Sequence, residues 1–118
     1  MTEVRASWDQ AAALQSVDGD WELLVEMAEL FLQDSGRLLA EIGQAIQAGD
    51  AGALHRTAHT LKGSVANFAA GKARETAFQL EMMGRSGNLS GAPALYTTLM
   101  AEMQRVDADL SNFARAPR

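Results

Sequence analysis

Residues 55–68 of this 118-residue chain read HRTAHTLKGSVANF and place two histidines, a lysine and a glycine in a segment with helical periodicity. With successive residues about 100° apart around a helix, the apolar side chains fall opposite His59, and they are Leu54, Leu61, Val65 and Phe68. We therefore expect His59 to point outward. Its own side of the helix collects small or basic residues, which are Gly52, His55, Arg56, Lys62, Gly63, Ala66 and Ala70.

This arrangement predicts phosphoryl chemistry at His59. Imidazole in its neutral form is a competent nucleophile near pH 7. Lys62, one helical turn later, can neutralise phosphoryl charge. Glycine in a helix interior is about 1 kcal/mol less favourable than alanine, so Gly63 indicates a position that must stay empty. The pattern suits an exposed histidine that another protein approaches closely, with a phosphate between the two surfaces.

Other interpretations of these residues remain open from spacing alone. Lys62 is equally compatible with an ordinary solvated lysine. His55 and His59 have the i, i+4 spacing of a metal-binding pair, but HRTAH lacks the glutamate of HExxH and no third ligand is evident, so we expect no metal site. Gly63 and Gly71-Lys72 do not have the spacing of a phosphate-binding glycine loop, and Ala73 stands where such a loop needs serine or threonine.

The rest of the sequence predicts helices that position this motif. Periodicity and turn residues indicate a short helix with Trp8, Ala11 and Ala12, and then a long one over 21–48. Asp50 is the expected N-cap of the motif helix, and Gly71 precedes a fourth helix that reaches about residue 84. Ser90 is the expected cap of the last helix. Apolar stripes are expected to be buried, and these are Leu23, Met27, Leu30, Phe31, Leu38, Ile42 and Ile46 in the second helix, Ala73, Ala77 and Leu80 in the fourth, Leu95, Leu99, Met103, Val106, Leu110 and Phe113 in the last, and all six methionines.

These elements predict an all-α fold, an antiparallel four-helix bundle with a short additional N-terminal helix, in a single domain over 1–118. The chain has no cysteine, no apolar run of membrane-spanning length and no signal-peptide core, so we expect a cytoplasmic protein without membrane contact. We also expect a monomer.

Charge is distributed unevenly along the chain. Residues 1–54 carry two basic and ten acidic side chains, whereas residues 55–85 carry five basic and two acidic ones. The overall charge of −5 argues against a nucleic-acid partner. The local excess of positive charge around His59 favours docking of an acidic pocket on a partner protein, and the basic docking residues that we expect are His55 when protonated, Arg56, Lys72, Arg74 and Arg85. Ala66 and Ala70 are expected to lie in the same docking surface.

The motif AHTLKGSVANF, residues 58–68, resembles the signature of histidine-containing phosphotransfer (HPt) domains, the four-helix-bundle relays of bacterial two-component phosphorelays. The resemblance extends over nearly the whole chain, because residues 7–64 are similar to the first helices and the phosphoacceptor helix of the family, and LEMMGRSGNL is similar to the end of its fourth helix. The chain departs from the family at Ala69, where many members have glycine.

By this resemblance His59 is the phosphoacceptor, Lys62 stabilises the phosphate, Gly63 gives access, and Glu81 hydrogen-bonds the second ring nitrogen of the acceptor. Glu81 is equally compatible with a surface carboxylate. The resemblance implies that a phosphoryl group passes from the aspartate of one response-regulator receiver domain, through this chain, to another receiver. It also implies magnesium in the receiver, no cofactor in this chain, and a hybrid sensor histidine kinase as a further partner. No ATP site is found, so the chain is expected to be a carrier and not an enzyme. The alternatives are an HPt-like module that binds and sequesters a receiver without chemistry, and a metal-dependent helical hydrolase, for which the required inward-facing ligands are absent.

Overall fold

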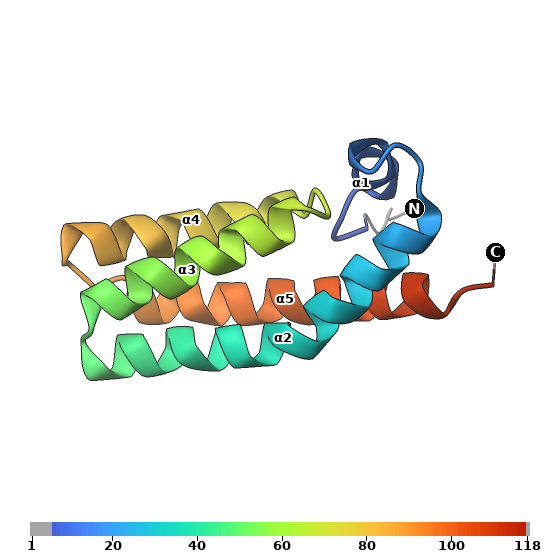
Figure 1. The fold of residues 1–118 in the computed structure, drawn as a ribbon. Coiled ribbons are helices and arrows are strands. Elements are labelled where there is room, and N and C mark those ends of the chain that lie inside the picture. Colours follow the sequence, from blue (N-terminus) through green and yellow to red (C-terminus); the bar gives the residue numbers. More distant parts are fainter. Residues whose placement is uncertain (1–5, 118) are drawn as a thin grey trace, which may run out of the picture.

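The computed structural model describes residues 6–117, which form five α-helices and no strand. The helices are α1 (Gln10–Ser16), α2 (Trp21–Ala48), α3 (Ala51–Ala66), α4 (Gly71–Ser86) and α5 (Ala92–Arg115). The long helices α2 to α5 form a bundle in which α2 and α4 each contact both α3 and α5, while α1 lies across the end where α2 begins (Figure 1). The predicted all-α bundle with a short N-terminal helix is confirmed. None of the helices within residues 6–117 has both the length and the apolar character needed to cross a membrane.

Aspartates begin the first three helices. The side chains of Asp9, Asp20 and Asp50 each accept a hydrogen bond from the backbone N–H three residues later, as an N-cap does. The predicted cap at Asp50 is confirmed. The predicted cap at Ser90 is wrong, because the cap position of α5 is Gly91, which makes no side-chain cap bond, and a proline in the first turn presets the helical φ instead.

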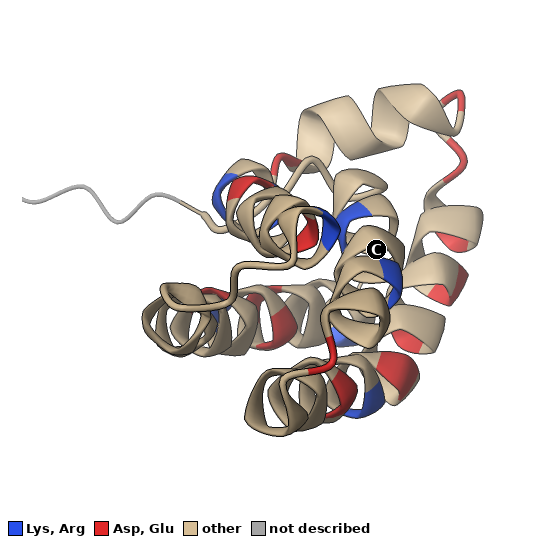
Figure 2. Cartoon of the chain, turned by 90° about the vertical axis from the view of Figure 1, so that its left-hand side faces the viewer, with Lys and Arg blue, Asp and Glu red and all other residues tan. Residues whose placement is uncertain are grey.

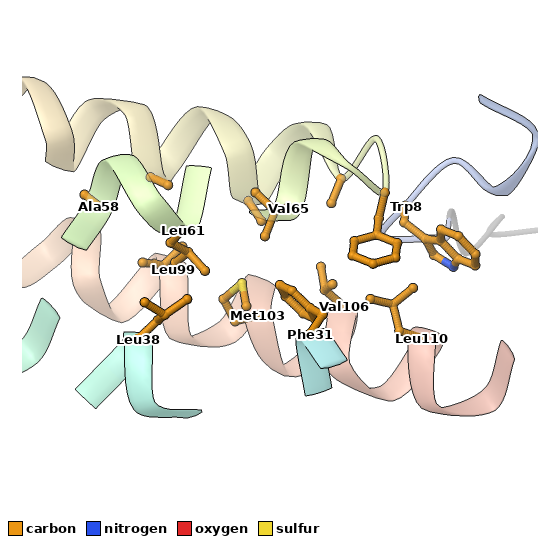
Figure 3. Packing of buried hydrophobic residues seen from close by; sticks show 14 of the residues in the cluster. Trp8, Phe31, Leu38, Ala58, Leu61, Val65, Leu99, Met103, Val106 and Leu110 are labelled. Atoms are coloured by element: carbon orange, nitrogen blue, oxygen red, sulfur yellow. The ribbon is translucent and has the colours of Figure 1, made fainter. Parts of the chain in front are cut away.

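Trp8 lies before α1 and not within it. The helix begins only after the Asp9 cap, and the Trp8 ring packs edge-on against Phe113 and Phe68, with ring centroids 5.0 Å and 6.1 Å away. Ala11 is exposed, and Ala13 is the buried alanine of this helix. The segment before α1 therefore closes one end of the core through an aromatic contact (Figure 3).

The predicted core face of α3 is confirmed, because Leu54, Leu61, Val65 and Phe68 are all almost completely buried. The inward residues predicted for α4 are buried too, as are those of α5 except Leu95, which is half-buried. Figure 3 shows Leu61 beside Leu99 of α5, and Val65 on the side of α3 that faces Phe31 of α2 and Met103 of α5.

The predicted stripe of α2 is partly wrong, because Leu23 and Leu30 are 42% and 64% exposed. Leu24 and Ala28 take the inward positions. Phe31, Leu38 and Ile42 are buried as predicted, and Met27 and Ile46 are half-buried. The buried face therefore differs from the prediction by one residue only near the start of α2. The prediction that every methionine is buried also fails at Met82 and Met100, which are exposed, while Met1 lies outside the described residues.

The chain reverses direction between α3 and α4 at Ala69. This residue has φ 51°, in the left-handed region that costs a residue with a Cβ about 1–2 kcal/mol, and it is the position where the HPt resemblance has glycine. Because α3 ends at Ala66, Ala70 no longer follows the helical rotation and is fully buried. Its expected place in an exposed docking surface beside His59 is therefore wrong. The reversal lays α4 antiparallel along α3.

Candidate functional site

His59 projects from α3 on the side opposite the core, and 64% of its side chain is exposed. Its Nδ1 lies 2.9 Å from Oε2 of Glu81 on α4. An ionised carboxylate only accepts hydrogen bonds, so Nδ1 carries the proton and donates it in this contact. In the neutral ring the lone pair then lies on Nε2. The site thus leaves Nε2 with its lone pair exposed.

Glu81 is the buried centre of the site, with 8% of the residue exposed. Its Oε1 lies 2.8 Å from Nζ of Lys62, and its Oε2 accepts from His59. Burial raises the pKa of the Glu81 carboxyl, but the contacts with Lys62 and His59 together outweigh burial and hold the pKa below its ordinary value. Glu81 is therefore ionised at neutral pH, as an acceptor for the ring N–H requires.

Lys62 is held from two directions. Its Nζ pairs with Glu81 and lies 5.1 Å from the ring centroid of Phe78, within the range of a cation–π contact, and only 20% of the side chain is exposed. Spacing alone placed Lys62 one turn beyond His59 but did not reveal this pairing. The structure therefore gives the lysine a structural contact within the site, in addition to the predicted role toward phosphate.

His55 approaches the same carboxylate from one turn earlier on α3. Its Nε2 lies 3.9 Å from Oε2 of Glu81, and 41% of its side chain is exposed. The distance is an ion-pair distance when His55 is protonated and too long for a hydrogen bond. Within residues 6–117 no group of three or more histidine, cysteine, aspartate or glutamate side chains is arranged to hold a metal ion.

The surface around the ring is open on α3. A Cβ added at Gly63 would meet no atom within 4 Å, and Ala66 is exposed. On α4 the neighbouring surface is apolar, because Phe78 and Met82 are 38% and 40% exposed on either side of Glu81 in the sequence. This exposed pair was not predicted from the sequence. Their spacing of one helical turn, around a carboxylate, was the signal available.

The predicted basic docking residues are exposed, apart from the half-buried His55, but they do not form one cluster. Arg56 lies on α3, and Lys72 and Arg85 lie at opposite ends of α4, about 20 Å apart along its axis. Arg74 lies between them, near the start of α4. Figure 2 shows basic residues distributed over several helices, whereas Asp and Glu recur along α2. Arg85, one turn from Glu81, is the α4 basic residue nearest to that carboxylate along the helix.

Comparison with known proteins agrees with this geometry. The family model described as Hpt domain matches residues 26–109. The crystal structure of histidine-containing phosphotransfer protein B (HptB) from Pseudomonas aeruginosa PAO1 is similar at a TM-score of 0.88 and 28% sequence identity, over 98% of this chain and 100% of that one. Comparison with curated proteins gives no match.

Proposed function

The chain belongs to the Hpt domain family, and from this premise we propose that it is a phosphorelay intermediate in which His59 accepts a phosphoryl group from a receiver aspartate and passes it to another receiver. The observation that carries the proposal is the hydrogen bond between Nδ1 of His59 and Glu81, 2.9 Å long, on a ring whose side chain is 64% exposed. That bond selects the tautomer with Nε2 free. The open surface at Gly63 supports access by a second protein.

In the proposed step, the Nε2 lone pair of His59 attacks the phosphorus of an aspartyl phosphate on the receiver. The N–P bond forms while the P–O bond to the aspartate breaks, and the aspartate leaves as a carboxylate. The ring becomes positively charged because Nδ1 keeps its proton, and the Glu81 carboxylate beside it stabilises that charge. Return transfer to a second receiver reverses the same bonds.

The other residues of the site have roles in keeping with this step. Lys62 is the cation available to the phosphoryl oxygens, and its pairing with Glu81 fixes its position. Magnesium is expected in the receiver partner, where it would supply the Lewis acid for the transferring phosphoryl group. Hpt domains are phosphotransfer carriers and not ATP-using enzymes, so we expect no autophosphorylation with ATP. A cytoplasmic location and a monomeric state are further parts of the proposal.

The test is incubation with a panel of receivers labelled on their aspartates. We expect label to move to the parent chain, to be lost from His59→Gln and to be largely retained by His55→Gln. The second variant is the matched control, because His55 lies on the same helix one turn away but has alanine and histidine, and not lysine and glycine, three and four residues later. The label should be labile in acid and stable in base, as a phosphoramidate is.

The alternative is a module that binds and sequesters a receiver without phosphoryl chemistry. It predicts receiver binding with no label on the parent chain for any member of the panel. Substantial label on the His59→Gln protein would instead overturn the assignment of the acceptor.

A further inference from the structure

Gly84 lies in the last turn of α4, where alanine would still favour the helix over glycine. It is buried, and it lies at a close contact with α3. A Cβ built on Gly84 would lie 2.5 Å from the backbone nitrogen of His55 and 2.7 Å from the carbonyl oxygen of Ala51. These atoms belong to the backbone of α3, so no side-chain rotation relieves the clash. Any larger residue at position 84 must separate the two helices locally.

This contact lies one turn from the hydrogen bond of the site. Helices α3 and α4 are antiparallel neighbours. A step of four residues toward the C-terminus of α3, from His55, therefore runs in the same direction in space as a step of three residues toward the N-terminus of α4, from Gly84. The two steps, about 6 Å and 4.5 Å along the helix axes, end at His59 and Glu81. The spacing of the backbones at Gly84 therefore bears directly on the distance between Nδ1 and Oε2.

We infer that Gly84 is a positioning residue for phosphotransfer, which lets α3 and α4 approach closely enough for Glu81 to hold the acceptor ring. This inference rests on the proposed function of His59. Relief of the clash requires the shortest distance to grow from 2.5 Å to an ordinary contact of about 3.4 Å, a movement of about 0.9 Å. A similar increase in the 2.9 Å bond between His59 and Glu81 takes it beyond the range of a hydrogen bond.

The first readout does not depend on any receiver. In the unphosphorylated protein, ¹⁵N NMR shifts of the His59 ring report which nitrogen carries the proton. The parent should show a dominant Nδ1–H tautomer, and Gly84→Ala and Glu81→Ala should each show a mixed population. Gly43→Ala is the control, since its Cβ would lie 2.6 Å from the Tyr96 hydroxyl and would disturb that side chain in the contact between α2 and α5, outside the site. It should keep the parent tautomer.

The second readout is a double-mutant cycle on the rate of His59 phosphorylation. We expect Gly84→Ala to slow labelling about tenfold in the parent, a barrier increase of about 1.4 kcal/mol, and by less than about twofold when Glu81 is already alanine. A purely structural effect would slow both backgrounds equally, and that result would overturn the inference, as would a parent-like tautomer in Gly84→Ala.

A shortened side chain tests the same spacing if Gly84→Ala does not fold. Glu81→Asp withdraws the carboxylate by one methylene while Gly84 and the helix contact stay unchanged, so it should lose the Nδ1–H preference. If Glu81→Asp keeps the Nδ1–H tautomer, side-chain rotation can compensate for a displacement of this size, and the inference would be wrong. If no receiver phosphorylates the parent, the proposed function fails while the tautomer measurements still decide the role of Gly84.

Discussion

Replacement of Glu81 by glutamine removes the charge at the centre of the site while keeping the side-chain shape. Glu81 is 8% exposed and contacts Lys62 and His59, so glutamine leaves the mostly buried Lys62 ammonium without its counter-charge. A hydrogen bond to a charged group contributes about 1.5–3 kcal/mol. The contact with the exposed His59 ring is screened by solvent and adds less. We expect Glu81→Gln to lower the free energy of unfolding by about 2 kcal/mol at pH 7, and the melting temperature by about 8 °C.

The loss should depend on pH in one direction. The pKa of Glu81 in the folded protein lies below its ordinary value of 4.5, because contacts with Lys62 and His59 outweigh burial. Its stabilisation is therefore fully present above about pH 4.5 and is lost as pH falls through the folded-state pKa. The difference in stability between the parent and Glu81→Gln should shrink over that acid range.

Urea unfolding of both proteins at pH 7 and at several values below pH 4.5 measures the difference. Glu75→Gln is the matched control, because Glu75 is an exposed glutamate of the same helix whose side chain receives only a 3.5 Å bond from Gln79. That control should change stability by less than about 0.5 kcal/mol. A loss for Glu81→Gln as small as the control, or one that stays constant through the acid range, would refute the reasoning about the buried carboxylate.

Three further outcomes are expected. Gly63→Leu should keep or raise the melting temperature, because it removes a helix penalty of roughly 1 kcal/mol. The same change should slow phosphorylation of His59 about tenfold or more, because the leucine side chain fills the open surface. Equal transfer rates in the variant and the parent would contradict the role of Gly63 in access. Ala69→Gly should raise the free energy of unfolding by up to about 1 kcal/mol, since it relieves the left-handed φ of 51°, and a lower stability in urea would count against that strain. Receiver affinity should fall as the salt concentration rises to about 0.1 M, because interactions between exposed charges are then screened over about 10 Å. An affinity that does not depend on salt would point to the apolar pair Phe78 and Met82 as the main docking contact.

Structural features that depend only on residues close together in the sequence were predictable from the sequence. The Asp50 cap, the buried face of α3 and the exposure of His59 follow from a repeat of 3.6 residues and from side-chain chemistry near the helix start. The open position at Gly63 follows in the same way. One error appeared where this local rule ended, at Ala70, which lies beyond the last helical residue of α3 and turns inward. Another appeared inside α2, where Leu23 and Leu30 are exposed because the neighbouring helices contact a slightly different side of α2.

The contact between His59 and Glu81 joins residues 22 positions apart, and the sequence offered it only through family resemblance. Whether Glu81 faces His59 and Lys62, or faces solvent, depends on the rotation of α4 about its axis and on its distance from α3. The left-handed turn at Ala69 and the close backbone contact at Gly84 bear on both quantities. Helical periodicity says which side of a helix is apolar, but it carries no information on how near a second helix lies. The carboxylate that contacts the His59 ring was therefore decided by tertiary packing alone.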